Sequence, residues 1–165
     1  MGILYTVWPL DAQAQEWLRS LDIDVPVSTS RWPRRTEIEQ VLGELQGFKV
    51  EYTLNGPGQR WDAFVSDGEE DENWTLLHAE PHENDDDCTH LSFEKGEPTL
   101  IVALLRSLSA ATGTLMLVPD IGCPPMVVSA SRSVAEIVAD FCGIEFSSQK
   151  WERLVQGAPG ARSLQ

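Results

Sequence analysis

Basic residues are scarce in this sequence. Its 165 residues include 12 Lys and Arg against 26 Asp and Glu, which gives a formal net charge of −14 at pH 7. Proteins bind nucleic-acid backbones and anionic membrane surfaces chiefly through Lys and Arg, and a chain with this charge repels both. We therefore expect neither nucleic acid nor a membrane among its partners.

Cysteines and long apolar runs are also few. The three cysteines, Cys88, Cys123 and Cys142, are odd in number and widely spaced, which indicates reduced thiols rather than a disulfide framework. The longest apolar run, 100–105, is far shorter than the roughly 20 residues that span a bilayer. The N-terminal residues lack the basic segment and cleavage site of a signal peptide. These absences predict a soluble, cytoplasmic protein.

Recognised catalytic motifs are missing as well. The sequence contains no Gly-x-Ser-x-Gly nucleophile elbow. The glycine-rich segment 55–58 lacks the Lys-Ser/Thr pair of a phosphate-binding loop and precedes a strand pattern rather than a helix, so we interpret it as a hairpin turn. We therefore expect no catalytic residue and no cofactor.

The composition is nevertheless that of a folded domain, with 42% apolar and 23% charged residues. Apolar patterns predict strands at 3–8, 48–54, 60–65, 74–79, 91–93, 114–118 and 126–128. Helical spacing predicts helices at 12–21, 37–46, 98–112, 134–141 and 148–155. We predict one α+β domain, 1–156, in which a mainly antiparallel sheet of about five or six strands packs against helices, and a flexible C-terminal tail, 157–165.

Three helix starts carry capping signatures. Asp11 stands where the N-cap of the first helix belongs, and Trp17 then falls at core spacing. Thr36 and Ser133 each have a Glu three residues later, which is the pattern of a capping box. The sequence therefore predicts helices that begin directly after Asp11, Thr36 and Ser133.

The negative charge is concentrated in the middle of the chain. The segment from Trp61 to Glu94 holds 12 of the 26 acidic residues and no Lys or Arg. Within it, Asp67–Glu72 and Glu83–Asp87 form two acidic clusters on either side of the strand predicted at 74–79. If the strands here form a meander, the two clusters lie at opposite rims of the sheet, whereas a crossover or a strand bend would change that.

These clusters are the candidate partner-binding site. Concentrated negative charge accelerates association with a basic surface, and exposed aromatic residues anchor interfaces, although the tryptophans could equally be core residues. The candidate residues are Asp67, Glu69, Glu70, Asp71, Glu72, Trp74, Glu83, Asp85, Asp86 and Asp87.

In its size, acidity and lack of a catalytic motif, the chain resembles the bacterial immunity proteins that protect cells against polymorphic or contact-delivered toxins. The resemblance rests on this general character and on no diagnostic motif. It implies a non-catalytic, cytoplasmic α+β protein that neutralises a basic cognate toxin by direct binding.

Two other functions stay open. His78, Glu80 and His82 would share one face of a strand, and imidazole with carboxylate is a ligand set for Zn²⁺ or Fe²⁺, so this group could form a metal or ligand site or the centre of an enzyme. Alternatively, the chain could be a structural subunit of a larger assembly, which predicts an exposed apolar patch and self-association.

Overall fold

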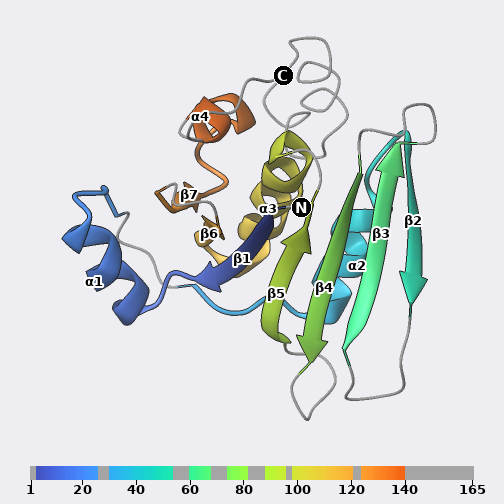
Figure 1. Ribbon diagram of the computed structural model, residues 1–165, viewed down its shortest axis with the longest axis horizontal. Coiled ribbons are helices and arrows are strands. Elements are labelled where there is room, and N and C mark those ends of the chain that lie inside the picture. Colours follow the sequence, from blue (N-terminus) through green and yellow to red (C-terminus); the bar gives the residue numbers. More distant parts are fainter. Residues whose placement is uncertain are drawn as a thin grey trace.

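One antiparallel sheet organises the computed structural model (Figure 1). The structure describes residues 3–25, 30–53, 60–67, 74–81, 88–95, 98–120 and 124–139. Within these ranges the strands are β1 (Leu4–Pro9), β2 (Phe48–Thr53), β3 (Trp61–Asp67), β4 (Trp74–Pro81), β5 (Cys88–Glu94), β6 (Leu115–Pro119) and β7 (Met126–Val128). The helices are α1 (Ala12–Ser20), α2 (Arg35–Gly43), α3 (Pro98–Thr112) and α4 (Val134–Ala139). The predicted α+β class is confirmed, with a seven-stranded sheet.

The strand order is β2-β3-β4-β5-β1-β6-β7, and every neighbouring pair is antiparallel. Strands β2 to β5 follow one another in space as in sequence, so this half of the sheet is the predicted meander. The first acidic cluster therefore precedes Trp74 at one end of β4, and the second follows Pro81 at the other end.

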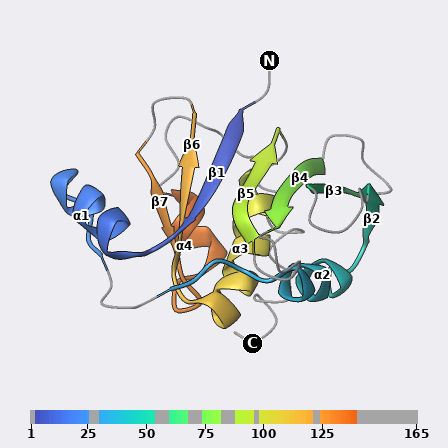
Figure 2. The ribbon, with the colours of Figure 1, turned by 90° about the horizontal axis from the view of Figure 1, so that it is seen from below.

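Helices α2, α3 and α4 lie on one side of the sheet, which we call the inner face (Figure 2). Helix α3 is apolar on nearly all sides because it is buried between the sheet and its neighbouring helices, as residues such as Ile101 and Leu105 show. The inner-face residues of the central strands, such as Ala63, Leu77 and Phe93, complete this core. No described helix is long and apolar enough to cross a membrane.

Helix α1 lies on the opposite side of the sheet, beside β6 and β7 (Figure 2). Asp11 caps it, as predicted, by accepting a hydrogen bond from the amide of Ala14 at 2.8 Å. Ala14 and Leu18 pack on Met116 and form a small second core. The prediction of a core position for Trp17 is wrong: these two residues make the buried stripe of this short helix, and the Trp17 side chain is 42% exposed.

Helix α2 begins at Arg35, so the predicted capping box at Thr36 is wrong. Glu37 performs the capping instead, because its carboxylate accepts a hydrogen bond from the Arg34 amide at 2.8 Å and pairs with Arg31 at 2.7 Å. The predicted cap of α4 is confirmed, since the Ser133 hydroxyl accepts a bond from the amide of Glu136.

Several predicted features lie outside the described residues. They are the hairpin turn at 55–58, the helix at 148–155, the tail at 157–165, Cys123 and Cys142. The strands on either side of that turn, β2 and β3, do pair antiparallel from Phe48 opposite Asp67 to Thr53 opposite Asp62.

Candidate partner-binding face

The face of the sheet opposite α2 and α3 is the candidate site, and we call it the outer face. Cross-strand partners share a face of a sheet, so two rows of side chains can be read across it from the strand registers. One row is Asp62, His78, Ser92 and Thr6, and the next is Phe64, Leu76, Glu94 and Leu4. No helix of the described part of the chain covers β2 to β5 on this face (Figures 1 and 2).

A charged cluster occupies the centre of the outer face around His78. The imidazole is buried, with 7% of the residue exposed, although it lies on the side of the sheet away from the main core. Its Nδ1 is 2.6 Å from Oδ1 of Asp62, and its Nε2 is 2.9 Å from Oε2 of Glu94. Arg60 adds its guanidinium, 3.1 Å from Asp62 and 2.6 Å from Nδ1 of His78.

Each ring nitrogen of His78 lies within hydrogen-bond distance of a carboxylate, and Nδ1 also lies next to the Arg60 guanidinium. The ring is therefore held in place by groups from both neighbouring strands, β3 and β5.

The pKa of Asp62 reflects the same contacts. Burial raises this pKa, but the hydrogen bonds from His78 and Arg60, together with the charges of those groups, outweigh the effect of burial. The net pKa of the carboxyl lies below its usual value, so Asp62 stays ionised at a lower pH than an unperturbed aspartate does.

The metal hypothesis for His78, Glu80 and His82 finds little support in this geometry. His78 and Glu80 do share the outer face, but both ring nitrogens of His78 are engaged by carboxylates on opposite sides of the ring. His82 lies outside the described residues. Among the residues that are described, no group of three His, Cys, Asp or Glu is arranged to hold a metal ion.

Aromatic side chains lie next to the charged cluster. The rings of Phe64 and Trp74 are 5.5 Å apart, at the end of the face where β3 leads toward the first acidic cluster. Phe64 is 36% exposed and Trp74 is half-buried, so the pair presents an apolar surface to solvent. Trp61, by contrast, points to the inner face and is 1% exposed.

Only two of the predicted partner-binding residues fall within the described ranges. Trp74 begins β4 and Asp67 ends β3, where its backbone but not its side chain is described. The others lie outside the described residues: Glu69, Glu70, Asp71, Glu72, Glu83, Asp85, Asp86 and Asp87.

Sequence reasoning missed the partners of His78. Arg60, Asp62 and Glu94 are 16 to 18 residues away in sequence, and only the strand registers bring them together. One signal was present in the acidic clusters themselves. The sequence midpoint between the partners Asp62 and His78 is position 70, and the midpoint between Leu76 and Glu94 is position 85. Each midpoint falls within one of the acidic clusters.

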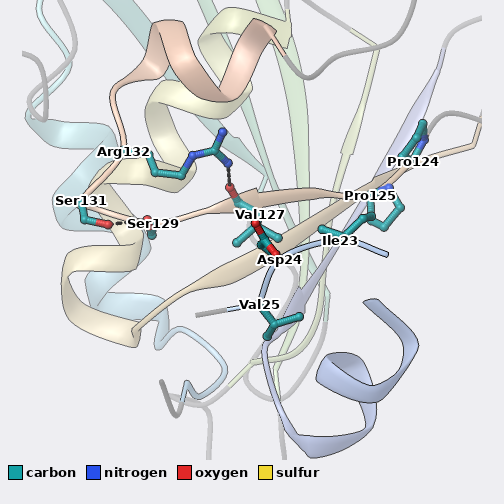
Figure 3. A pocket seen from close by; sticks show the side chains of 9 residues that line it. All are labelled: Ile23, Asp24, Val25, Pro124, Pro125, Val127, Ser129, Ser131 and Arg132. Atoms are coloured by element: carbon teal, nitrogen blue, oxygen red, sulfur yellow. Dashed lines mark hydrogen bonds between the residues drawn. The ribbon is translucent and has the colours of Figure 1, made fainter. Parts of the chain in front are cut away.

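Two hollows occur elsewhere on the described surface. A cavity of about 720 Å³ lies between residues 23–25 and residues 124–132 (Figure 3). Three of its polar side chains are engaged with the protein: Arg132 donates to the carbonyls of Val127 and Glu136, and the Ser129 and Ser131 hydroxyls bond each other at 2.9 Å. A second hollow, beside Trp8 and Trp17, contains the carboxylate of Asp11, which already caps α1. The first hollow has no aromatic lining residue, whereas the second combines the exposed rings of Trp8 and Trp17 with the Asp11 carboxylate.

No protein-family model matches this chain, and no curated protein or solved structure matches it either.

Proposed function

We propose that this chain is a non-catalytic acidic binding protein that neutralises a basic partner by direct contact, as an immunity protein does with its cognate toxin. The partner would meet the outer face of the sheet between the two acidic clusters. The proposal includes a cytoplasmic location, where such a toxin would act.

The observation that carries this proposal is the combination of surfaces on the outer face. Phe64 and Trp74 supply a partly exposed aromatic surface, and the carboxylates of Asp62 and Glu94 lie beside it. Aromatic anchors surrounded by charge are the usual composition of a specific protein interface. A face of a sheet that no described helix covers gives such an anchor access to a partner.

The charge distribution adds the expected sign of the partner. Both ends of β4 lead into acidic clusters, and the middle segment has no Lys or Arg between Trp61 and Glu94. A surface of this kind raises the association rate with a cationic protein by roughly 10- to 1000-fold, and the gain falls as salt increases. A toxin with a cleft built to hold a polyanionic substrate presents such a cationic surface.

The first experiment identifies the partner. The protein is used to capture binders from a lysate of its own cells at low and at high salt, and the retained proteins are identified by mass spectrometry. The proposal predicts one basic protein that is retained at low salt and lost at high salt. If only acidic proteins, or none, are retained under both conditions, the proposal of a basic partner is wrong.

The second experiment tests the site with that purified partner. Replacing Glu69, Glu70, Asp71 and Glu72 by Lys should slow association at least tenfold and flatten its salt dependence, with the melting temperature unchanged. Phe64→Ser should instead speed dissociation, because it removes an anchor and not a steering charge.

A matched control separates local from overall charge. Glu16 and Glu44 are exposed residues on or next to helices. The double variant Glu16→Lys with Glu44→Lys changes the net charge as much as Glu69→Lys with Glu70→Lys, because each replaces two Glu by two Lys. The proposal predicts a clearly smaller loss of association rate for the control pair. Equal losses in the two double variants would contradict a binding role for the first acidic cluster.

A further inference from the structure

Strand β2 is an edge of the sheet within the described part of the chain. It is six residues long, its register with β3 is continuous, and no described strand lies on its other side. Natural edge strands are commonly shortened, bulged, covered or given charged side chains, because their unpaired amides and carbonyls bind other strands. Of these devices, the described residues give β2 only the charged side chains, Lys49 and Glu51. The opposite edge follows this rule, since β7 has only three residues, all buried, and follows Pro124 and Pro125.

We propose that β2 pairs with β2 of a second copy of this chain, antiparallel and with Val50 opposite Val50, to form a dimer with one continuous sheet. This inference concerns the edge of the sheet and stands independently of the function proposed for its outer face.

The first argument for a second copy is that β2 is complementary to itself in charge. With Val50 at the two-fold axis, Lys49 faces Glu51 of the second copy, and Glu51 faces Lys49. Both side chains are exposed, and neither forms an ion pair within the described part of the chain. Their partners on β3 are uncharged: Lys49 lies opposite Ser66, and Glu51 lies opposite Phe64. Opposite charges that face each other across strands stabilise a sheet.

The second argument concerns the inner side of the strand. The same register places Phe48 opposite Tyr52 of the second copy. By symmetry this pair occurs twice, once on each side of the Val50 pair. Tyr52 is 40% exposed, and Phe48 and Val50 are partly buried against the main core. Pairing would therefore extend the core of each copy into the other and cover aromatic surface that now faces solvent.

Other registers are less favourable. A shift of two residues in one direction places Glu51 opposite Glu51, and in the other direction it places Lys49 opposite Lys49. A shift of one residue opposes inner-face with outer-face side chains and breaks the alternation of the strand. The register centred on Val50 thus has both charge and aromatic complementarity.

Charge exchange at positions 49 and 51 tests the proposal, with sedimentation equilibrium at about 0.15 M salt as the measurement. The wild type should show a reversible dimer. Lys49→Glu makes both cross-strand contacts pairs of carboxylates, and Glu51→Lys makes both pairs of ammonium groups. Each single variant should weaken dimerisation about tenfold or more, and the double variant Lys49→Glu with Glu51→Lys should restore it to within about threefold of wild type.

The set of variants distinguishes this interface from the effect of net charge. Two copies at −14 repel each other, so Glu51→Lys, which makes each chain less negative, would strengthen a dimer governed by net charge. The proposed register predicts that it weakens the dimer. The double variant keeps the wild-type net charge and serves as the internal control, and thermal melting of all four proteins shows that they fold alike.

A monomeric wild type at all attainable concentrations would overturn the proposal. So would a dimer that Glu51→Lys strengthens, a double variant that fails to recover, or a dimer that none of the variants alters. None of these outcomes decides whether the chain binds a basic partner, because that is measured by capture and not by the oligomeric state.

Discussion

Asp62→Asn should destabilise the protein through the buried imidazole of His78. The carboxylate of Asp62 accepts from Nδ1 of His78 at 2.6 Å and from Nε of Arg60 at 3.1 Å. Asparagine keeps the size of the side chain but loses its charge, so both charge-assisted contacts weaken while His78 stays buried. Hydrogen bonds to charged groups contribute about 1.5–3 kcal/mol, and Asp62 is only 25% exposed. We expect a loss of about 1.5–3 kcal/mol in the free energy of unfolding at pH 7.

The pH dependence of this loss provides a stricter test. The pKa of Asp62 is lowered in the folded state, so the unfolded chain takes up its proton first as the pH falls. The stabilisation is therefore fully present above the unfolded pKa of about 3.9 and disappears as the pH falls through the lower folded value. Urea unfolding of wild type and Asp62→Asn at pH 5 and pH 3 should show a difference that is smaller at pH 3 than at pH 5.

Glu80→Gln is the matched control, because Glu80 is an exposed carboxylate of the same face of β4. It should change the free energy of unfolding by less than about 0.5 kcal/mol. A loss below 0.5 kcal/mol for Asp62→Asn as well, or a loss that persists undiminished at pH 3, would refute the role assigned to this carboxylate.

Two further predictions concern the fold. Glu37→Gln should cost about 0.5–1.5 kcal/mol at pH 7, because the bidentate pair with Arg31 loses its charge. That pair lowers the pKa of Glu37, so the difference in urea melts should begin to shrink below the unfolded value of about 4.3 and disappear as the pH falls through the lower folded value. Trp61→Ala should cost about 3–5 kcal/mol because the ring is 1% exposed. Trp17→Ala, at 42% exposure, should cost less than about 1 kcal/mol, and equal losses in thermal melts would contradict the burial assigned to these tryptophans.

The sequence predicts elements well where one periodicity dominates. The alternation in 48–54 and the apolar run of 100–111 correspond to β2 and α3, because a half-buried strand and a fully buried helix leave clear patterns. It fails where two local solutions compete. Thr36 and Glu37 both fit the start of α2, and the additional bond of Glu37 to Arg31 favours the earlier start.

The candidate site shows a different limit. His78 attracts attention in the sequence because Glu80 and His82 are near it, yet its observed partners come from the neighbouring strands β3 and β5. Local spacing describes one strand, whereas a site on a sheet is assembled across strands by the register. The sequence midpoints of the β3–β4 and β4–β5 pairs fall within the two acidic clusters, so the positions of the clusters agree with the register. A count of charges alone does not reveal which residues pair.

The two proposed interfaces meet at one pair of residues. Glu51, on the edge strand, lies directly opposite Phe64 of β3, which belongs to the proposed aromatic anchor. Pairing of two β2 strands would bring the outer faces of both copies into one surface, with an aromatic anchor on each side of the axis. A partner that covers Phe64 would then lie against the Lys49 and Glu51 contacts of the dimer. Binding of the partner and dimerisation are then linked. If the partner changes the dimerisation constant by some factor, dimerisation must change the affinity for the partner by the same factor.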